Sequence, residues 1–192
     1  MQNEGDIRMH TLATSKGSDP LFYSDMQFID FGADNCFRIE DSHFYKKSLQ
    51  HMGYKTVEFV TYKSPNESGE GSLYFVEAKT SLRPCINTER AANEIADIAQ
   101  KFIDALQIVC GAWHGDRQHK VSLPINFQAF KISGSKIVFV LVVKHSENKN
   151  FLWVADAIER ELKREMRLWK FTVKVLSEEL AIKEKLVIPS DT

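Results

Sequence analysis

The chain has 192 residues, of which 43% are hydrophobic and 27% are charged, and its formal net charge is -1 at pH 7. This composition predicts a globular protein with a sizeable core, and it excludes a global electrostatic attraction to nucleic acid or membranes. Any site for a polyanion must therefore be a local patch. No apolar run reaches the roughly 18 residues that a membrane span needs.

The cysteines and the amino-terminal segment bear on the subcellular localisation of the protein. Cys36, Cys85 and Cys110 are widely spaced and odd in number, which fits neither a disulfide framework nor a zinc site. Residues 1–26 form a polar arm without the apolar centre of a signal peptide. We therefore expect a cytoplasmic protein with no membrane partner, in which a single domain over residues 27–192 follows the arm.

The first half of the chain predicts two hairpins with a helix between them. "MQFIDF" reads as a strand that the turn "GADN" would pair with "CFRIE". A helix over residues 41–52 would begin at Asp41 or Ser42 and end at Gly53. The strands "KTVEFVTYK" and "SLYFVEAKT" then form a second hairpin across the long loop "SPNESGEG".

The second half predicts alternating helices and strands. A long helix over 88–110, closed by Gly111, carries apolar residues at three- and four-residue steps. The later elements are strands over 125–132 and 136–144, a helix over 150–169, a strand over 170–177 and a short helix or tail over 178–187. Because residues 138–143 are all apolar, that strand is expected at the centre of a sheet covered on both sides. The fold class is α/β, with a mixed β-sheet.

Two charges end the strand "SLYFVEAKT" on one of its faces. Residues two apart in a strand point to the same side, so Glu77 and Lys79 follow Leu73 and Phe75 on a face that begins as core. Taken alone, this pattern is explained by a weak ion pair between Glu77 and Lys79 on the same face, which would contribute under about 1 kcal/mol to stability.

A third charge makes this face a candidate site. Glu58 interrupts the apolar run Val57, Phe59 and Val60 on the neighbouring hairpin strand, where a carboxylate needs a cation. In the hairpin, Glu58 could lie across from Glu77, and two converging carboxylates repel unless a cation lies between them. Oxygen ligands of this kind suit Mg²⁺ or Mn²⁺, with Lys79 placed to orient or deprotonate an attacking water and to balance phosphate charge.

From "RIED" to "VEAKTS" the chain resembles the PD-(D/E)xK nuclease superfamily, the restriction-endonuclease-like fold. That family has an acidic helix, an Asp on the first hairpin strand, (D/E)-x-K on the second strand, and then a helix. Glu58 in "TVEFV" matches the first acid, although Glu replaces Asp and Val57 replaces the common Pro. Glu77 and Lys79 in "FVEAK" match the pair. Some relatives carry a Gln four residues before a Tyr on the helix after the Lys. Here the residue four positions after Gln100 is Asp104, so this signature is incomplete.

The resemblance implies a restriction-endonuclease-like mixed sheet flanked by helices on both faces and a metal-dependent nuclease. Glu58 and Glu77 would hold Mg²⁺ or Mn²⁺ with the backbone carbonyl of Ala78, Glu40 would support them, and Lys79 would serve the water. Lys63 and Arg83 are the expected phosphate contacts. DNA is favoured over RNA, with specificity supplied by a second copy or a protein partner, and with DNA repair or defence against foreign DNA as the setting. The alternative is an inactive binding or assembly module, in which Glu77 pairs with Lys79 and Glu58 pairs with Lys55 or Lys63.

Two further clusters favour ordinary surface roles over function. The segment "WHGDRQH" could bind a metal through His114, Asp116 and His119, but its spacing matches no zinc pattern and a plain loop is expected. Basic residues on the 150–169 helix alternate with Glu159, Glu161 and Glu165, as on a solvated helix face. These basic residues are Arg160, Lys163, Arg164, Arg167 and Lys170.

Overall fold

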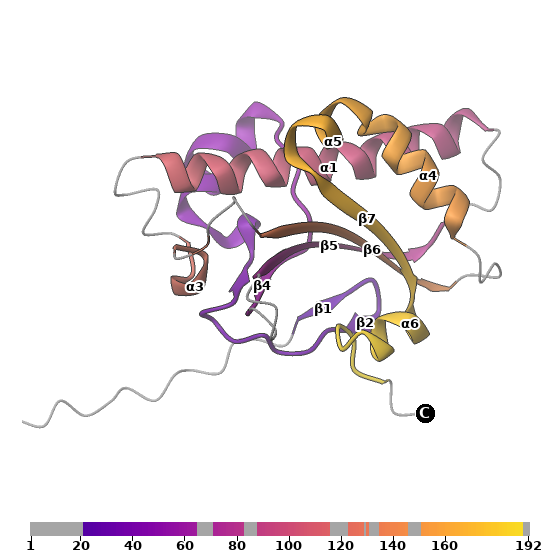
Figure 1. Cartoon of the computed structure of the whole chain (residues 1–192), viewed down its shortest axis with the longest axis horizontal. Helices are drawn as coiled ribbons and strands as arrows, with labels where there is room; N and C mark the ends of the chain where they lie inside the picture. Colours follow the sequence, from indigo (N-terminus) through magenta and orange to yellow (C-terminus); the bar gives the residue numbers. More distant parts are fainter. Residues whose placement is uncertain are drawn as a thin grey trace, which may run out of the picture.

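A five-stranded mixed sheet lies at the centre of the computed structural model (Figure 1). The structure describes residues 21–64, 71–82, 88–115, 123–128, 130, 135–145 and 151–189. The strands of the sheet, in spatial order, are β3 (Cys36–Phe37), β4 (Phe59–Lys63), β5 (Ser72–Ser81), β6 (Lys136–His145) and β7 (Phe171–Ser177). The pairs β3–β4 and β4–β5 are antiparallel, whereas the pairs β5–β6 and β6–β7 are parallel.

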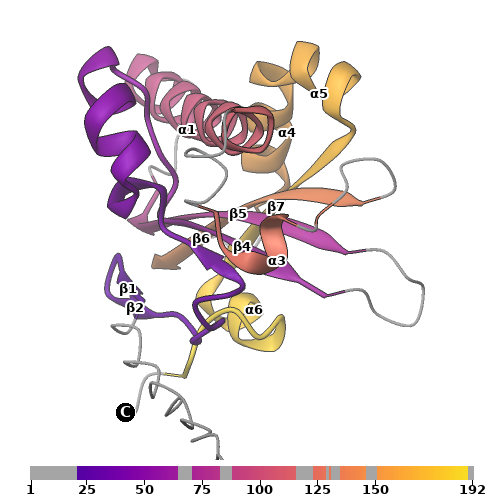
Figure 2. The same cartoon turned by 90° about the vertical axis from the view of Figure 1, so that its left-hand side faces the viewer.

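Helices connect the parallel strands, because a parallel pair needs a crossover. Helix α1 (Glu89–His114) lies between β5 and β6 in the chain, and helices α4 (Leu152–Glu161) and α5 (Lys163–Trp169) lie between β6 and β7. All three cover one face of the sheet (Figures 1 and 2). The opposite face carries α6 (Glu178–Lys183) and a small hairpin of β1 (Phe22–Tyr23) and β2 (Met26–Gln27).

Each face of the sheet contributes its own apolar core. On β5, Leu73 and Phe75 join the core beneath α1, and Val76 and Ala78 join the core above α6. Strand β6 is fully apolar from Ile137 to Val143 because it has a neighbouring strand on each edge and a core on each face. A mixed α/β sheet with β6 in its interior, as expected from the sequence, is therefore confirmed.

Helix α1 packs its apolar face across the sheet. The Thr88 hydroxyl caps the helix by accepting a hydrogen bond from the Ala91 amide at 3.2 Å. The ring of Phe102 stacks on that of Phe139 of β6, with centroids 4.8 Å apart. The predicted stop at Gly111 is wrong: the helix continues to His114, because Trp113 is anchored by a 2.7 Å hydrogen bond from its indole nitrogen to the Phe127 carbonyl.

The predicted hairpin of "MQFIDF" with "CFRIE" is also wrong. Strand β2 pairs with β1, across a turn in which Ser24 and Asp25 have positive φ of 49° and 59°. Phe28 bridges to Val187, and the short strand β3 pairs with β4 instead. The β1–β2 hairpin spans the expected boundary between the arm and the domain.

Three predicted elements have a different form in the structure. Residues 39–52 make short turns and not a regular α-helix: 3-10 turns at Ile39–Asp41 and Gln50–Met52 and a π-helical turn at Tyr45–Leu49. The predicted strand at 125 begins as the helical turn α3 (Ile125–Gln128), since Pro124 favours the first turn of a helix and its carbonyl accepts the Phe127 amide.

The third difference lies in the predicted 150–169 helix, which is interrupted at Leu162. There the backbone leaves the helical region (φ -91°, ψ 10°), and the buried side chain of Leu162 divides α4 from α5. Strand β7 and helix α6 follow as expected. None of the described helices has both the length and the apolar character required to span a membrane.

Candidate active site

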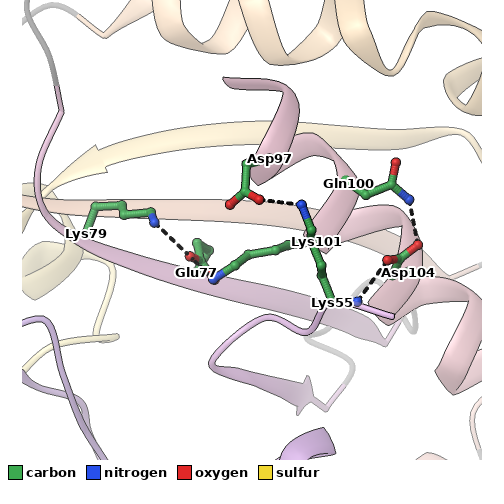
Figure 3. A network of polar contacts seen from close by, with 7 residues as sticks. All are labelled: Lys55, Glu77, Lys79, Asp97, Gln100, Lys101 and Asp104. Carbon is green, nitrogen blue, oxygen red and sulfur yellow. Dashed lines mark hydrogen bonds and ion pairs between the residues drawn. The ribbon is translucent and has the colours of Figure 1, made fainter. Parts of the chain in front are cut away.

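Glu77 is a fully buried carboxylate at the border between β5 and α1. Its side chain is 0% exposed, and it follows Leu73 and Phe75 on the α1 face, because alternate residues of a strand share a face. A buried charge of this kind requires partners. Two lysines supply them, as Figure 3 shows.

The closer partner of Glu77 is Lys101, in the middle of α1. Its Nζ lies 2.7 Å from Oε1 of Glu77 and donates a hydrogen bond to it, while Nζ of Lys79 lies 3.7 Å from the same oxygen. The second oxygen, Oε2, is buried and accepts no hydrogen bond from any described residue. One side of the carboxylate is therefore neutralised, and the other side is left free to accept.

The charges of this cluster shift its proton equilibria. Burial raises the pKa of Glu77, against the lowering effect of the Lys101 and Lys79 charges. For Lys101, burial opposes the ammonium, but attraction to Glu77 and the hydrogen bond to it outweigh burial and raise the pKa. Lys101 is thus held as a cation beside Glu77.

Glu58 immediately precedes β4 and lies within the electrostatic influence of Glu77. It occupies a bend one residue beyond the last residue pair between β4 and β5, which is Phe59 with Val76. Burial, followed by the charge of Glu77, raises the pKa of Glu58 to about 7. No hydrogen bond or ion pair joins its carboxylate to a described residue.

Glu40 lies at the edge of this cluster, on the 3-10 turn that precedes the irregular helical segment. Its Oε1 accepts a 2.7 Å hydrogen bond from the hydroxyl of Thr56, a buried residue two positions before Glu58. The charge of Glu40 also contributes to the raised pKa of Glu58. The three expected acids therefore lie near enough to one another for the charges of Glu40 and Glu77 to raise the pKa of Glu58.

A second polar network fixes α1 against the segment that leads into β4 (Figure 3). The backbone amide of Lys55 donates to Oδ2 of the buried Asp104 at 2.9 Å, and Gln100 donates to Oδ1 of Asp104 at 2.6 Å. The Lys55 ammonium bonds Oδ1 of Asp97 at 2.5 Å. These contacts fix the segment before β4, which includes Glu58, relative to helix α1.

Of the remaining predicted contacts, Lys63 is not gathered at this cluster. Ala78 lies beyond the last β4–β5 pair, with its side chain in the core of the opposite face. Lys63 also lies on that opposite face: its Nζ is 4.6 Å from the ring centre of Tyr74 and 3.4 Å from the Glu184 carbonyl. Arg83 lies outside the described residues.

Few side chains near Glu77 could serve as ligands for a metal ion. Within the described ranges, no group of three or more His, Cys, Asp or Glu side chains lies close enough together to hold a metal ion. A cation at this place would have Oε2 of Glu77, the carboxylate of Glu58 and backbone carbonyls as its ligands from the protein. Oε2 is the one atom that the structure shows to be both buried and without a donor from the described chain at this cluster.

Lys101 is the residue that the sequence analysis missed. Asp97, Lys101 and Asp104 are spaced four and three residues apart, so they form a polar stripe beside the apolar face of α1. Such a stripe can be recognised in the sequence, but its partner Glu77 cannot. Of the metal alternative in "WHGDRQH", His114 belongs to α1 and its Nδ1 lies 3.0 Å from the Cys110 carbonyl, while Asp116 and His119 lie outside the described residues.

Comparison with known proteins gives this chain no relatives from which a function could be transferred. No family model matches it, and no significant match is found among curated proteins or among solved structures.

Proposed function

We propose that this protein is a metal-dependent phosphodiester hydrolase that acts on nucleic acid, with its site at Glu58, Glu77 and Lys79. The observation that carries the proposal is the state of Glu77, which is completely buried yet keeps Oε2 without a donor from the described residues. Leaving a buried carboxylate oxygen unpaired is costly, so such an atom favours a role in binding.

The unpaired Oε2 of Glu77 and the nearby carboxylate of Glu58 are suitable ligands for a hard divalent cation. When ionised, Glu77 and Glu58 present acceptor-only oxygens in the same region, and Mg²⁺ is commonly bound by one or two carboxylates together with substrate phosphate. When bound, the cation would polarise the phosphate and lower the pKa of a water nucleophile. Glu58 and Glu77 would hold it, with the Ala78 carbonyl as a further ligand and Glu40 in support.

Lys79 would act on the reacting groups from the rim of the site. Its side chain is 28% exposed, whereas Glu77 is inaccessible, so Lys79 is the member of the pair that a substrate can reach. At 3.7 Å from Glu77 it is held loosely, and its ammonium can orient the attacking water or balance charge on the phosphate.

The topology agrees with the resemblance to the PD-(D/E)xK nucleases. An antiparallel hairpin, with Glu58 just before β4 and Glu77 on β5, is followed by a helix and then by β6, parallel to β5. This order supports a restriction-endonuclease-like fold. The free thiols of Cys36 and Cys110 accord with the reducing compartment that we propose, the cytoplasm.

The second candidate function is a non-catalytic binding or assembly module. It is favoured by the 2.7 Å contact of Lys101 with Glu77, which already neutralises one carboxylate oxygen. The partners expected for Glu58 in that reading are engaged elsewhere, since Lys55 bonds Asp97 and Lys63 lies on the other face of the sheet. This leaves Glu58 without either of the two lysines that the binding-module reading assigns to it.

A cleavage assay tests the proposal. Supercoiled, linear and single-stranded DNA and single-stranded RNA are incubated with the purified protein in Mg²⁺ or Mn²⁺, with EDTA as blank. We expect cleavage by the wild type and by the matched control Lys163→Ala, an exposed lysine of α5. Lys79→Ala should be slower by about 100-fold or more. Unchanged cleavage by Lys79→Ala would reject this site, and no cleavage of any substrate would favour the binding module.

A further inference from the structure

Glu77 has a cationic partner in the structure that the proposed catalytic set does not use. Lys101 reaches from the middle of α1 to Oε1 of Glu77 at 2.7 Å, a full 1.0 Å closer than Lys79, whose distance is 3.7 Å. The Lys101 side chain is 23% exposed, so most of it is enclosed between the helix and the sheet. Lys101 is therefore the principal counter-ion of Glu77.

A divalent cation and Lys101 would use the same carboxylate. Two positive charges close to one buried carboxylate repel each other strongly, because few waters screen them there. The free oxygen Oε2 belongs to the same group that Lys101 holds through Oε1. Binding of a dication to Glu77 must therefore weaken the contact of Lys101 with this carboxylate.

The helix offers Lys101 a second carboxylate. Asp97 lies one turn earlier on α1, at the i,i-4 position, where side chains are neighbours. Asp97 already binds the Lys55 ammonium through Oδ1, its charge favours the cationic form of Lys101, and its side chain is 41% exposed, within reach of solvent. The long, flexible stem of a lysine lets its ammonium move between two such acceptors.

We propose that Lys101 is the built-in counter-ion of the metal site, which neutralises Glu77 before a divalent cation binds and turns toward Asp97 when it binds. Lys101 thereby limits the affinity for the cation and keeps the buried acid stable without it. This inference rests on the proposed function, since it takes Glu77 to be a metal ligand. It assigns Lys101 a role in cation exchange, separate from the role of Lys79 toward the substrate.

Calorimetric titration of Mn²⁺ without nucleic acid tests the inference. The titration is run at pH 8, above the pKa of about 7 of Glu58, so that this carboxylate is available to the metal. We expect Lys101→Met to bind Mn²⁺ at least tenfold more tightly than the wild type, because the competing charge is gone. Lys101→Arg, which keeps the charge, and the exposed control Lys163→Met should bind like the wild type. Glu77→Gln should lose binding.

The outcomes separate this inference from the proposed function. Equal or weaker binding by Lys101→Met, with binding by the wild type that Glu77→Gln abolishes, would overturn the counter-ion role and leave the metal site intact. Absence of Mn²⁺ binding in both the wild type and Lys101→Met would overturn the metal site, and the inference with it.

A measurement on the wild type covers the case in which Lys101→Met does not fold. The rate at which an acetylating reagent modifies Lys101 is followed by peptide mass spectrometry, with and without Mn²⁺. Release from Glu77 should raise the rate at Lys101 at least threefold in Mn²⁺ and leave the rate at Lys163 unchanged. The same rate at Lys101 in both conditions, at saturating Mn²⁺, would overturn the inference.

Discussion

Oε1 of Glu77 on β5 and Nζ of Lys101 on α1 lie 2.7 Å apart, and this ion pair joins the sheet to the helix that covers it. The two residues are 24 positions apart in the chain, so the contact exists only when α1 is docked on the sheet. A buried pair of this kind is costly to break from one side only, because the remaining charge keeps its desolvation penalty.

The first prediction concerns the stability of this pair in EDTA. Lys101→Met should lower the free energy of unfolding by about 2 to 4 kcal/mol, since Lys79 at 3.7 Å compensates only in part. The double variant Glu77→Met with Lys101→Met should recover most of that loss, because no charge is then left buried. Urea unfolding followed by circular dichroism measures both, and strictly additive effects of the two substitutions would contradict the pair.

The second prediction concerns pH. The folded pKa of Glu58, about 7, lies above its ordinary value of 4.5, so the folded state binds the proton more tightly than the unfolded state. The contribution of Glu58 to stability is complete below about pH 4.5 and is lost as pH rises to about 7. In EDTA, Glu58→Gln should be more stable than the wild type by about 1 to 2 kcal/mol at pH 8, after allowance for solvent screening, and equally stable near pH 4.5.

Thermal unfolding of the wild type and Glu58→Gln at a series of pH values measures this difference. A gap between the two melting temperatures that does not change with pH would rule out a raised pKa at Glu58. Added Mn²⁺ should reverse the order at pH 8, because the metal stabilises only the protein that keeps the Glu58 carboxylate.

The third prediction concerns the network that fixes the start of β4. Asp104→Ala removes the acceptor of the Lys55 amide and should cost about 1 to 3 kcal/mol, whereas Asp104→Asn keeps an acceptor and should cost less. Gln107→Ala, an exposed change on the same helix, serves as the control and should be close to neutral. Chemical denaturation ranks the three variants, and a loss in Asp104→Ala no larger than in Gln107→Ala would refute the role of Asp104.

The fourth prediction compares two buried threonines in one segment. Thr61 on β4 is 0% exposed and its hydroxyl has no hydrogen-bond partner among the described residues, so Thr61→Val should stabilise the protein by up to about 1 kcal/mol. Thr56→Val removes the hydrogen bond to Glu40 and should destabilise by about 1 kcal/mol. Melting curves give the sign of each change, and a destabilised Thr61→Val would reveal a partner for its hydroxyl.

The sequence predicts the parts of this fold in which a periodic apolar pattern meets a local signal. The hairpin of β4 and β5, the apolar strand β6 and the long helix α1 follow from such patterns. The pairing of β3 with β4 could not be predicted, because a strand of two residues shows almost no alternation and its pairing depends on the tertiary packing of the sheet. The interruption at Leu162 is equally hidden, since apolar spacing continues through it.

The candidate site shows the same division. Alternation along a strand places Glu77 and Lys79 on one face, and the hairpin of β4 and β5 brings Glu58 within the electrostatic influence of Glu77. Lys101 could not be assigned to Glu77, because a charge beside the apolar face of a helix is most often solvated and its partner lies in another element. Lys63 was expected near the site, but strand alternation turns it to the other face.

The most direct test of a metal-dependent nuclease site at Glu77 compares the rate of phosphodiester cleavage in Mg²⁺ by the wild type and by Glu77→Gln. The two proteins differ by one buried oxygen and by one charge at the centre of the site. Under single-turnover conditions, on the substrate that the wild type cleaves fastest, we predict a loss of about 100-fold or more in Glu77→Gln. Equal rates for the two proteins, or no cleavage by the wild type of any nucleic acid, would contradict a nuclease site at Glu77.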